Sequence, residues 1–304
     1  MLVFNATYKD KKGICLKTSK LEAIILPDEG GKMVSLKAVK NWEELLAQAP
    51  GETYLPLTPD GSYVNSECSA FDDMFPTIDP WHNGVREYED HGEVCRRPHN
   101  VKIIEGEDIQ VELSVKSPAG DYIFTKTYCE KAGSLQINYS CQNLTDKPLP
   151  VLWAAHFMMA AKEGRQVMLS SPENGKYEAT CMFWRGTQGA DGVEPVGKGQ
   201  LFTIDSTSGY LKSAAYSADS SAYKFYLNNE YTDSLIYGDI ILKCENAPYL
   251  GIWINNGPFK GMYNVAAEFC TAGFDTPGAA MEHGHDVYVP AGQERKWSFN
   301  IDII

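Results

Sequence analysis

The chain has 304 residues, of which 27 are Lys or Arg and 40 are Asp or Glu, so its formal net charge is -13. Nucleic-acid binding depends on Lys and Arg that displace counterions from phosphates, and this charge therefore argues against DNA, RNA and anionic membranes as partners. Hydrophobic residues at 43% and charged residues at 22% are typical of a folded globular protein rather than a disordered or fibrous one.

The N-terminal residues MLVFNATYKDKKG lack the basic start, apolar stretch and cleavage site of a secretory signal, and no apolar run approaches the roughly 20 residues that span a bilayer. Eight cysteines include no CxxC pair, which argues against a zinc ribbon or a redox motif. The simplest interpretation is that these cysteines are reduced thiols, which predicts a cytoplasmic protein. Because no segment repeats and no biased linker divides the sequence, we expect a single domain over residues 1–304.

Two elements are predicted in the first fifty residues. Residues 21–26 (LEAIIL) form a short apolar run that is typical of a strand. A helix is predicted from Trp42 to about Ala49, because Asn41 can cap it, Glu44 stands at the capping-box position, and a Pro-Gly pair follows it.

The middle of the chain alternates between apolar and polar residues. Ile109, Val111, Leu113 and Val115 would face one way and their polar neighbours the other, which predicts a half-buried strand. Residues 118–121 supply a turn, and residues 122–128 and 135–141 predict two more strands, so we expect a three-stranded meander. Similar runs occur at residues 238–243, 249–254 and 297–303. Many strands and few short helices predict an all-β fold, a large antiparallel β-sandwich.

Candidate chemistry lies in four segments that place ionisable or aromatic groups among turn residues: FDDMFP (71–76), DHGE (90–93), WAAHF (153–157) and AAEFC (266–270). His156 and Glu268 have apolar neighbours, and removal from water shifts pKa values. A histidine in such a stretch is also commonly a satisfied core residue, whereas a carboxylate is seldom buried without a partner or a purpose.

Blocks along nearly the whole chain resemble the aldose 1-epimerase (galactose mutarotase) family and its wider mutarotase-like superfamily. In chain order they are LEAIILPDEGGKMVSLK (21–37), FDDMFPTIDP (71–80), DHGEV (90–94), LWAAHF (152–157), YLGIWINNGPFKGMYNVAAEFCTAG (249–273) and VYVPAGQERKWSFNI (287–301). Their order and placement carry the resemblance. It implies a large antiparallel β-sandwich that interconverts the α and β anomers of a free sugar or sugar phosphate.

The resemblance also implies roles for three residues: Glu268 as catalytic base, His156 as general acid, and His91 as the second histidine of the sugar pocket. Mutarotation requires a carboxylate that takes the anomeric hydroxyl proton and an acid that protonates the ring oxygen. Two such groups suffice, so no cofactor is expected. His156 stands in Ala-Ala-His-Phe rather than in the Asn-His-x-Tyr-Phe context of the best-known members, which leaves the identity of the sugar open.

Other residues are candidates for binding the sugar. Asp72 and Asp73 could contact hydroxyl groups, or serve as turn devices. Arg97, like Arg86 and Arg96, could favour a phosphorylated or acidic sugar through bidentate hydrogen bonds. Aromatic rings stack on the apolar face of a pyranose or pack in the core, and the candidates are Trp184, Trp81, Trp153 and Phe259.

Two other functions stay open. A carbohydrate-binding or regulatory protein could keep the sandwich and the pocket without the chemistry. A carbohydrate hydrolase or lyase could use paired carboxylates drawn from Asp72, Asp73 and Glu268. Residues 282–286 (EHGHD) hold several metal-type ligands, but we interpret them as a polar loop and predict no metal. The expected partner is a small-molecule sugar, bound by a monomer or a homodimer.

Overall fold

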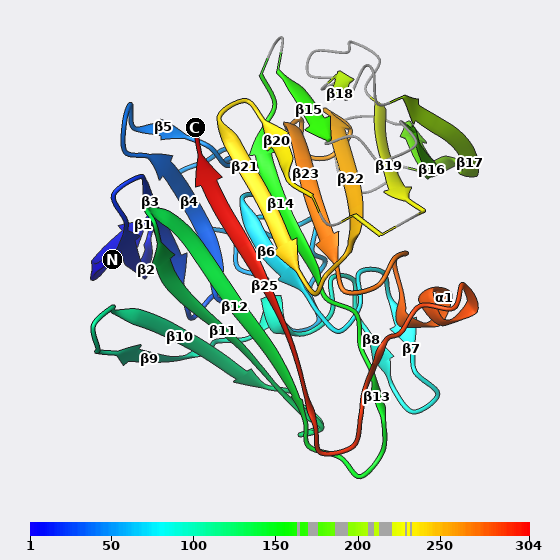
Figure 1. The fold of residues 1–304 in the computed structure, drawn as a ribbon, viewed down its shortest axis with the longest axis horizontal. Coiled ribbons are helices and arrows are strands. Elements are labelled where there is room, and N and C mark those ends of the chain that lie inside the picture. Colours follow the sequence, from blue (N-terminus) through cyan, green and yellow to red (C-terminus); the bar gives the residue numbers. More distant parts are fainter. Residues whose placement is uncertain are drawn as a thin grey trace.

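The computed structural model describes residues 1–162, 165–169, 176–185, 194–205, 210–212, 221–228, 230–231 and 233–304, with the backbone alone for 176–178, 181–185, 194–205, 210–212 and 221. Its strands form two large antiparallel sheets (Figure 1). The first sheet has the strand order β1 (Leu2–Tyr8), β2 (Lys11–Lys17), β3 (Leu21–Leu26), β4 (Lys32–Ala38), β6 (Phe71–Met74), β14 (Ala154–Ala160), β23 (Tyr263–Cys270), β22 (Tyr249–Asn256), β19 (Ser221–Leu227), β16 (Lys176–Arg185) and β17 (Glu194–Asp205), and β5 (Glu43–Glu44) pairs with β4.

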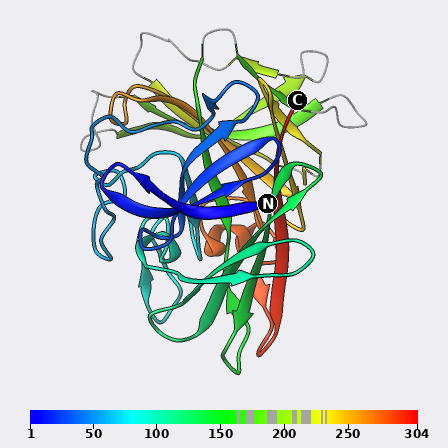
Figure 2. The ribbon, with the colours of Figure 1, turned by 90° about the vertical axis from the view of Figure 1, so that its left-hand side faces the viewer.

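The second sheet has the order β18 (Tyr210–Lys212), β15 (Gln166–Leu169), β20 (Leu235–Tyr237), β21 (Ile240–Glu245), β25 (Glu294–Ile303), β12 (Ser134–Asn143), β11 (Tyr122–Lys131), β10 (Gln110–Lys116) and β9 (Asn100–Ile104). Two short ribbons pair β13 (Leu149–Pro150) with β24 (Tyr288–Val289) and β7 (Trp81–His82) with β8 (Glu87–Tyr88). The helical elements are a 3₁₀ turn, η1 (Val94–Arg96), and α1 (Pro277–Glu282). In Figure 2 the blue N-terminal strands, at one edge of the first sheet, face the viewer.

The predicted strands are confirmed. β3 has the predicted bounds, and β10, β11 and β12 pair consecutively as the expected meander, with Val115 opposite Phe124 and Phe124 opposite Cys141. Along β10, Val111, Leu113 and Val115 are buried, whereas their neighbours are only partly buried or exposed. The period-two pattern therefore identified the face that packs inward.

The predicted helix over residues 42–49 is wrong. Trp42 has a positive φ of 58°, which a right-handed helix does not allow, and residues 43–44 form β5 beside β4. Glu44 does accept backbone hydrogen bonds, but from Leu36 on the neighbouring strand and from Leu46 two residues further on, rather than at a helix start. Pairing with an existing strand edge overrode the local capping pattern.

The helix that does form, α1, follows a signal that the sequence contains. Thr276 precedes it and its hydroxyl accepts a hydrogen bond from the amide of Ala279, while Pro277 occupies the first turn. Both residues suit a helix N-terminus, since proline needs no donor there and threonine satisfies one of the free amides.

The two sheets pack face to face through a large apolar core. Phe71 and Phe157 on the first sheet each contact Phe299 on the second, with ring centroids 5.6 Å apart in both cases. The same core cluster contains residues from Leu16 to Ile303. The single domain over residues 1–304 stays a prediction. Among the described residues, no helix is long and apolar enough to cross a membrane.

A buried ion pair also joins the two sheets. Asp73 on β6 lies 2.7 Å from the ammonium of Lys126 on β11, and its other oxygen accepts a hydrogen bond from the indole of Trp153. Lys126 also donates to the carbonyl of Gly31 at 2.6 Å. All of these side chains are buried, so each charge depends on the other for compensation.

Replacing Asp73 with Asn should therefore leave an uncompensated ammonium in the core. We expect the free energy of unfolding in urea to fall by about 3–5 kcal/mol. The matched control is Asp239→Asn, because Asp239 and Lys40 form an ion pair at the surface, where about 0–1 kcal/mol is expected. Equal losses in the two variants would contradict the structural role of Asp73.

His99 predicts a further dependence of stability on pH. Burial, followed by the nearby Lys126 ammonium, lowers the pKa of His99 to about 3. The unfolded chain binds a proton here near pH 6.5 and the folded chain does not, so stability is complete above pH 6.5 and is lost as the pH falls towards 3. Between pH 7 and pH 5, the free energy of unfolding in urea should fall by about 2 kcal/mol more in the natural protein than in His99→Gln. Identical losses would refute this.

Candidate functional site

The register of the first sheet brings the predicted base and the predicted acid together. The pairs Ala154 with Cys270 and Phe157 with Ala267 align β14 with β23, and this alignment puts His156 opposite Glu268. Residues directly opposite one another on antiparallel strands point to the same face, with Cβ atoms about 4.5–5.5 Å apart. Two residues that are distant in the sequence are therefore neighbours in the sheet.

This face is the one turned away from the sandwich core. Ala155, Phe157, Ala267 and Phe269 alternate with the two site residues and belong to the core cluster. Because successive side chains point to opposite faces, burial of these four residues directs His156 and Glu268 outward. Around His156 and Glu268, residues from connecting loops cover this face, among them Tyr63, His91 and Phe259.

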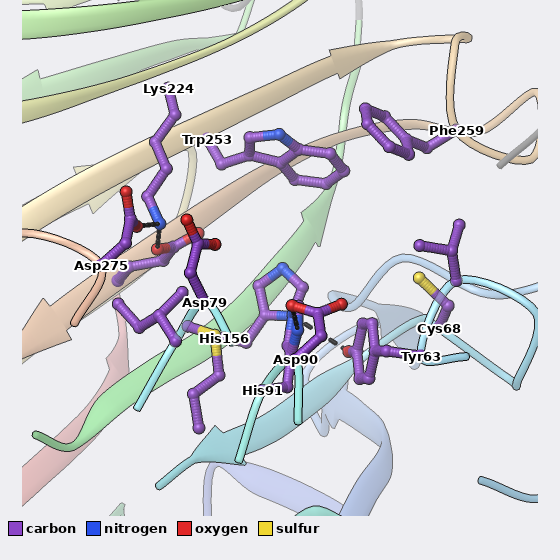
Figure 3. A pocket seen from close by; sticks show the side chains of 14 residues that line it. Tyr63, Cys68, Asp79, Asp90, His91, His156, Lys224, Trp253, Phe259 and Asp275 are labelled. Atoms are coloured by element: carbon purple, nitrogen blue, oxygen red, sulfur yellow. Dashed lines mark hydrogen bonds and ion pairs between the residues drawn. The ribbon is translucent and has the colours of Figure 1, made fainter. Parts of the chain in front are cut away.

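A cavity of about 260 Å³ lies between this face and its covering loops (Figure 3). Four of its lining residues come from consecutive neighbouring strands of the first sheet: His156 on β14, Glu268 on β23, Trp253 on β22 and Lys224 on β19. In Figure 3, Trp253 and Phe259 lie on one side of the cavity and His91 and Tyr63 on the other, with Lys224 and Asp275 at one end. The remaining lining residues are Val64, Cys68, Met74, Ile78, Asp79 and Asp90.

His156 ends a buried chain of polar contacts. Its Nδ1 lies 3.0 Å from the hydroxyl of Tyr63, which donates at 2.7 Å to Asp72, and Asp72 forms an ion pair with Lys32. Burial, and then the charges of His91, Lys224 and Lys32, lower the pKa of His156 well below 6.5. His156 is therefore a neutral imidazole at neutral pH.

His91 has a different partner. Its Nδ1 lies 2.9 Å from an Asp90 carboxylate oxygen, and its ring stacks on Tyr63 with centroids 3.6 Å apart and planes 9° apart. His91 has a φ of 65°, and Gly92 follows at 70°, where an added Cβ would collide with the carbonyl of Phe75. A strained backbone turn thus holds this imidazole over the cavity.

Glu268 shares a lysine with Asp275. The ammonium of Lys224 lies 2.6 Å from Glu268 Oε2 and 2.8 Å from Asp275 Oδ1, and Tyr226 also donates to Asp275. Burial raises the pKa of Glu268, and the charge of Lys224 opposes this rise. Burial would lower the pKa of Lys224, but Asp275 and Glu268 outweigh it, so the pKa is raised and the lysine stays charged.

Solved structures share this architecture at low sequence identity. A galactose mutarotase-like protein from Clostridium acetobutylicum matches with a TM-score of 0.68 and 16% identity, covering 100% of this chain and 98% of its own. The chain has a galactose mutarotase-like fold. A galactose mutarotase related enzyme from Lactobacillus acidophilus gives 0.56 and 15%, covering 100% and 97%, and a GalM/aldose epimerase homologue from C. elegans gives 0.56 and 12%, covering 95% and 97%.

Sequence comparison matches the chain to no family model and to no curated protein. At 12–16% identity, the structural matches establish the galactose mutarotase-like fold and leave the activity to be argued from the site.

Within this fold, the structure brings the three predicted catalytic residues, Glu268, His156 and His91, to one cavity. Of the predicted sugar-binding residues, Asp72 and Asp73 lie elsewhere. Asp72 is one step behind the cavity, covered by Tyr63, and Asp73 points into the core. Both carboxylates are held by buried lysines, and neither lines the cavity.

Arg97 does not line the cavity either. Arg97 lies with Glu93 and Ser117 in a separate surface recess. Trp184 belongs to β16, and its side chain lies outside the described residues. The other two arginines are occupied: Arg86 pairs with Glu93 and Asp121, and Arg96 donates to loop carbonyls.

Of the other aromatic candidates, Phe259 lines the cavity, Trp153 is buried in the core, and Trp81 stacks on Tyr88. Sequence reasoning missed Trp253, which packs edge-on against both His156 and Phe259. A signal was present, because Trp253 alternates with Ile252 and Ile254 and so lies on the face opposite the core.

Sequence reasoning also missed Lys224, Tyr63 and Asp275. Lys224 lies between apolar residues of β19, where a buried lysine signals a carboxylate partner but not which one. Tyr63 and Asp275 lie in irregular segments, so no periodicity could place them.

The residues around 282–286 contribute to the end of α1 and the turn after it. His285 Nδ1 accepts a hydrogen bond from the amide of Gly273, and His283 stacks on Phe274. Among the described residues, no group of three or more His, Cys, Asp or Glu side chains is placed to hold a metal ion.

Gly251 lies opposite both Glu268 and Tyr226 in the sheet. A Cβ there would come within 2.9 Å of the Tyr226 ring and 3.5 Å of Glu268 Cβ. Gly251→Ala should displace the Tyr226 ring that contacts Asp275, and should lower the free energy of unfolding by about 1–3 kcal/mol. Gly106→Ala is the control, since its Cβ meets only one atom at 3.7 Å. Urea unfolding that finds both variants alike would show that the ring has room to move.

Proposed function

We propose that this protein is an aldose 1-epimerase-like isomerase that interconverts the α and β anomers of a free aldose. The observation that carries the proposal is the convergence of one buried carboxylate, Glu268, and two imidazoles, His91 and His156, on a single cavity. Sugar ring opening needs a base at the anomeric hydroxyl and a proton donor at the ring oxygen, and these residue types supply both.

Glu268 is suited to act as the base. Its side chain is buried, which makes the carboxylate a stronger proton acceptor than one in water, while Lys224 keeps it charged in the resting state. It takes the proton of the anomeric hydroxyl as the bond between C1 and the ring oxygen breaks. An imidazole gives a proton to the ring oxygen, the aldehyde rotates, and the reverse transfers close the ring on the other face.

The size of the cavity favours a monosaccharide. Its volume of about 260 Å³ lies just below the roughly 300–1,000 Å³ that is typical of ligand pockets. Trp253 and Phe259 offer an aromatic wall for the apolar face of a pyranose, opposite the polar groups of His91 and Asp90. A single sugar ring would contact both walls.

The charge of the cavity favours an uncharged sugar over a sugar phosphate. Four carboxylates line it, from Asp79, Asp90, Glu268 and Asp275, against the single ammonium of Lys224 among the described lining residues. A phosphate would meet net repulsion here. The cytoplasmic location and the oligomeric state stay predictions.

The proposal is tested by measuring anomer exchange. Exchange NMR over a panel of free hexoses and pentoses, with sugar 6-phosphates for comparison, should show acceleration of at least one free aldose. Glu268→Gln should lower turnover by at least ~10²-fold while sugar binding is largely kept, because the amide cannot accept the proton. The control is Glu245→Gln, at an exposed position on the second sheet, which should leave turnover unchanged.

Each outcome decides between alternatives. Acceleration of no sugar would remove the isomerase, and tight sugar binding without exchange would favour a carbohydrate-binding protein. Normal turnover in Glu268→Gln would reject Glu268 as base.

A further inference from the structure

The hydrogen bonds around Tyr63 determine which nitrogen of His156 carries a proton. Asp72 forms an ion pair with Lys32, so its carboxylate is charged and can only accept. Burial, and then the charge of Asp72, raise the pKa of Tyr63 well above 10, so Tyr63 keeps its hydroxyl proton and donates it to Asp72. The Tyr63 oxygen must then accept the hydrogen bond from His156 Nδ1.

This assignment leaves His156 Nε2 with a lone pair. The imidazole could donate from Nε2 only as a charged ring, and the surroundings oppose that charge. Burial comes first, and three basic residues face the ring from three elements: His91 from its loop, Lys224 from β19 and Lys32 from β4. The acidic residues opposite His156 in the sheet register, Asp72 on β6 and Glu268 on β23, already have lysine partners.

His91 is placed in the opposite situation. The Asp90 carboxylate accepts from Nδ1, and although burial opposes it, the charge of His91 and this hydrogen bond lower the pKa of Asp90. The electron-rich face of Tyr63 lies against the His91 ring, which also stabilises a cation. Arg96 fixes the turn by donating to the carbonyls of Asp90 and Gly92 at 2.7 Å and 2.9 Å.

We propose that His91, held by Asp90, is the imidazole that gives its proton to the sugar ring oxygen, and that Tyr63 is a positioning residue that keeps His156 neutral as a hydrogen-bond acceptor. This inference rests on the proposed isomerase. It reverses the roles that the family resemblance implies for the two histidines.

The proton transfers balance over a full turnover. Glu268 takes the anomeric hydroxyl proton, and the electrons of that bond form the carbonyl as the bond from C1 to the ring oxygen breaks. The ring oxygen of the sugar takes the proton of His91 Nε2. This leaves a neutral imidazole that keeps its proton on Nδ1, where it donates a hydrogen bond to Asp90. On closure, the new hydroxyl recovers a proton from Glu268 and His91 recovers its own. His156 Nε2 accepts a hydrogen bond from another sugar hydroxyl throughout.

The first test reads protonation directly and needs no substrate. Long-range ¹H–¹⁵N correlation spectra distinguish the two neutral tautomers and the charged form of each imidazole, and the variants His156→Gln and His91→Gln assign the signals. At pH 7 in the full-length protein, His156 should show the neutral form with the proton on Nδ1, unchanged between pH 5.5 and 8. Tyr63→Phe should move it towards the form with the proton on Nε2.

The matched control is Tyr122→Phe. Tyr122 is also buried and its hydroxyl also donates to a carboxylate, Glu93, but it lies outside the cavity lining. Tyr122→Phe removes a phenolic hydroxyl, as Tyr63→Phe does, but should leave the His156 signals unchanged. A charged His156 at pH 7, or one protonated on Nε2, would overturn the proposal.

The second test assigns the donor by kinetics. With the best free aldose of the panel, log kcat/KM should fall as the pH rises past the point where the donor loses its proton. Asp90→Asn should lower turnover, because His91 loses the carboxylate that accepts from its Nδ1 and orients its ring. His91→Gln should lower turnover by at least ~10²-fold and abolish the fall, whereas His156→Gln should keep it.

The two levels of the argument can fail separately. Loss of the fall in His156→Gln together with its retention in His91→Gln would restore His156 as the acid and leave the isomerase intact. If no sugar exchanges anomers, the proposed function fails and the donor role falls with it, while the spectra still decide whether Tyr63 sets the tautomer of His156.

Discussion

The site depends on the register between β14 and β23. Alternate residues of these two strands, Ala155 and Phe157 on β14 and Ala267 and Phe269 on β23, point into the core. The residues between them, His156 and Glu268, therefore point to the opposite face. A slip of one residue would turn a carboxylate and an imidazole into the apolar core and would turn phenylalanines onto the opposite face, which is why the packing of the sandwich specifies the geometry of the site. The apolar core thus fixes where the polar chemistry occurs.

Buried lysines connect the core and the site. Lys126 is neutralised by Asp73, Lys32 by Asp72, and Lys224 by Glu268 with Asp275. Burying an ion pair costs desolvation energy, whereas burying hydrophobic side chains does not. The presence of these pairs therefore suits a role in positioning particular side chains rather than in stability alone. Adjacent aspartates on β6 serve both needs, since one points to the core and the other to the cavity face.

Much of the fold could be predicted from alternation, because β10 and β11 bury every second residue along most of their length. The helix at residues 42–49 failed because a local capping pattern competes poorly with pairing to a neighbouring strand. Glu268, His156 and His91 came from the family resemblance. Their partners could not be predicted. Lys224 reaches the site through long-range strand pairing and Tyr63 through the path of a loop, and neither can be recognised in a single sequence.

The cavity is assembled from two kinds of support. Glu268, His156 and Lys224 belong to neighbouring strands of one sheet, whereas Tyr63, His91, Phe259 and Asp275 come from four separate connecting segments. Loops accept substitution and changes of length far more readily than sheet interiors do. Descendants of this chain could therefore accept a different ligand by remodelling the covering segments, while the Glu268 carboxylate stays anchored on its strand.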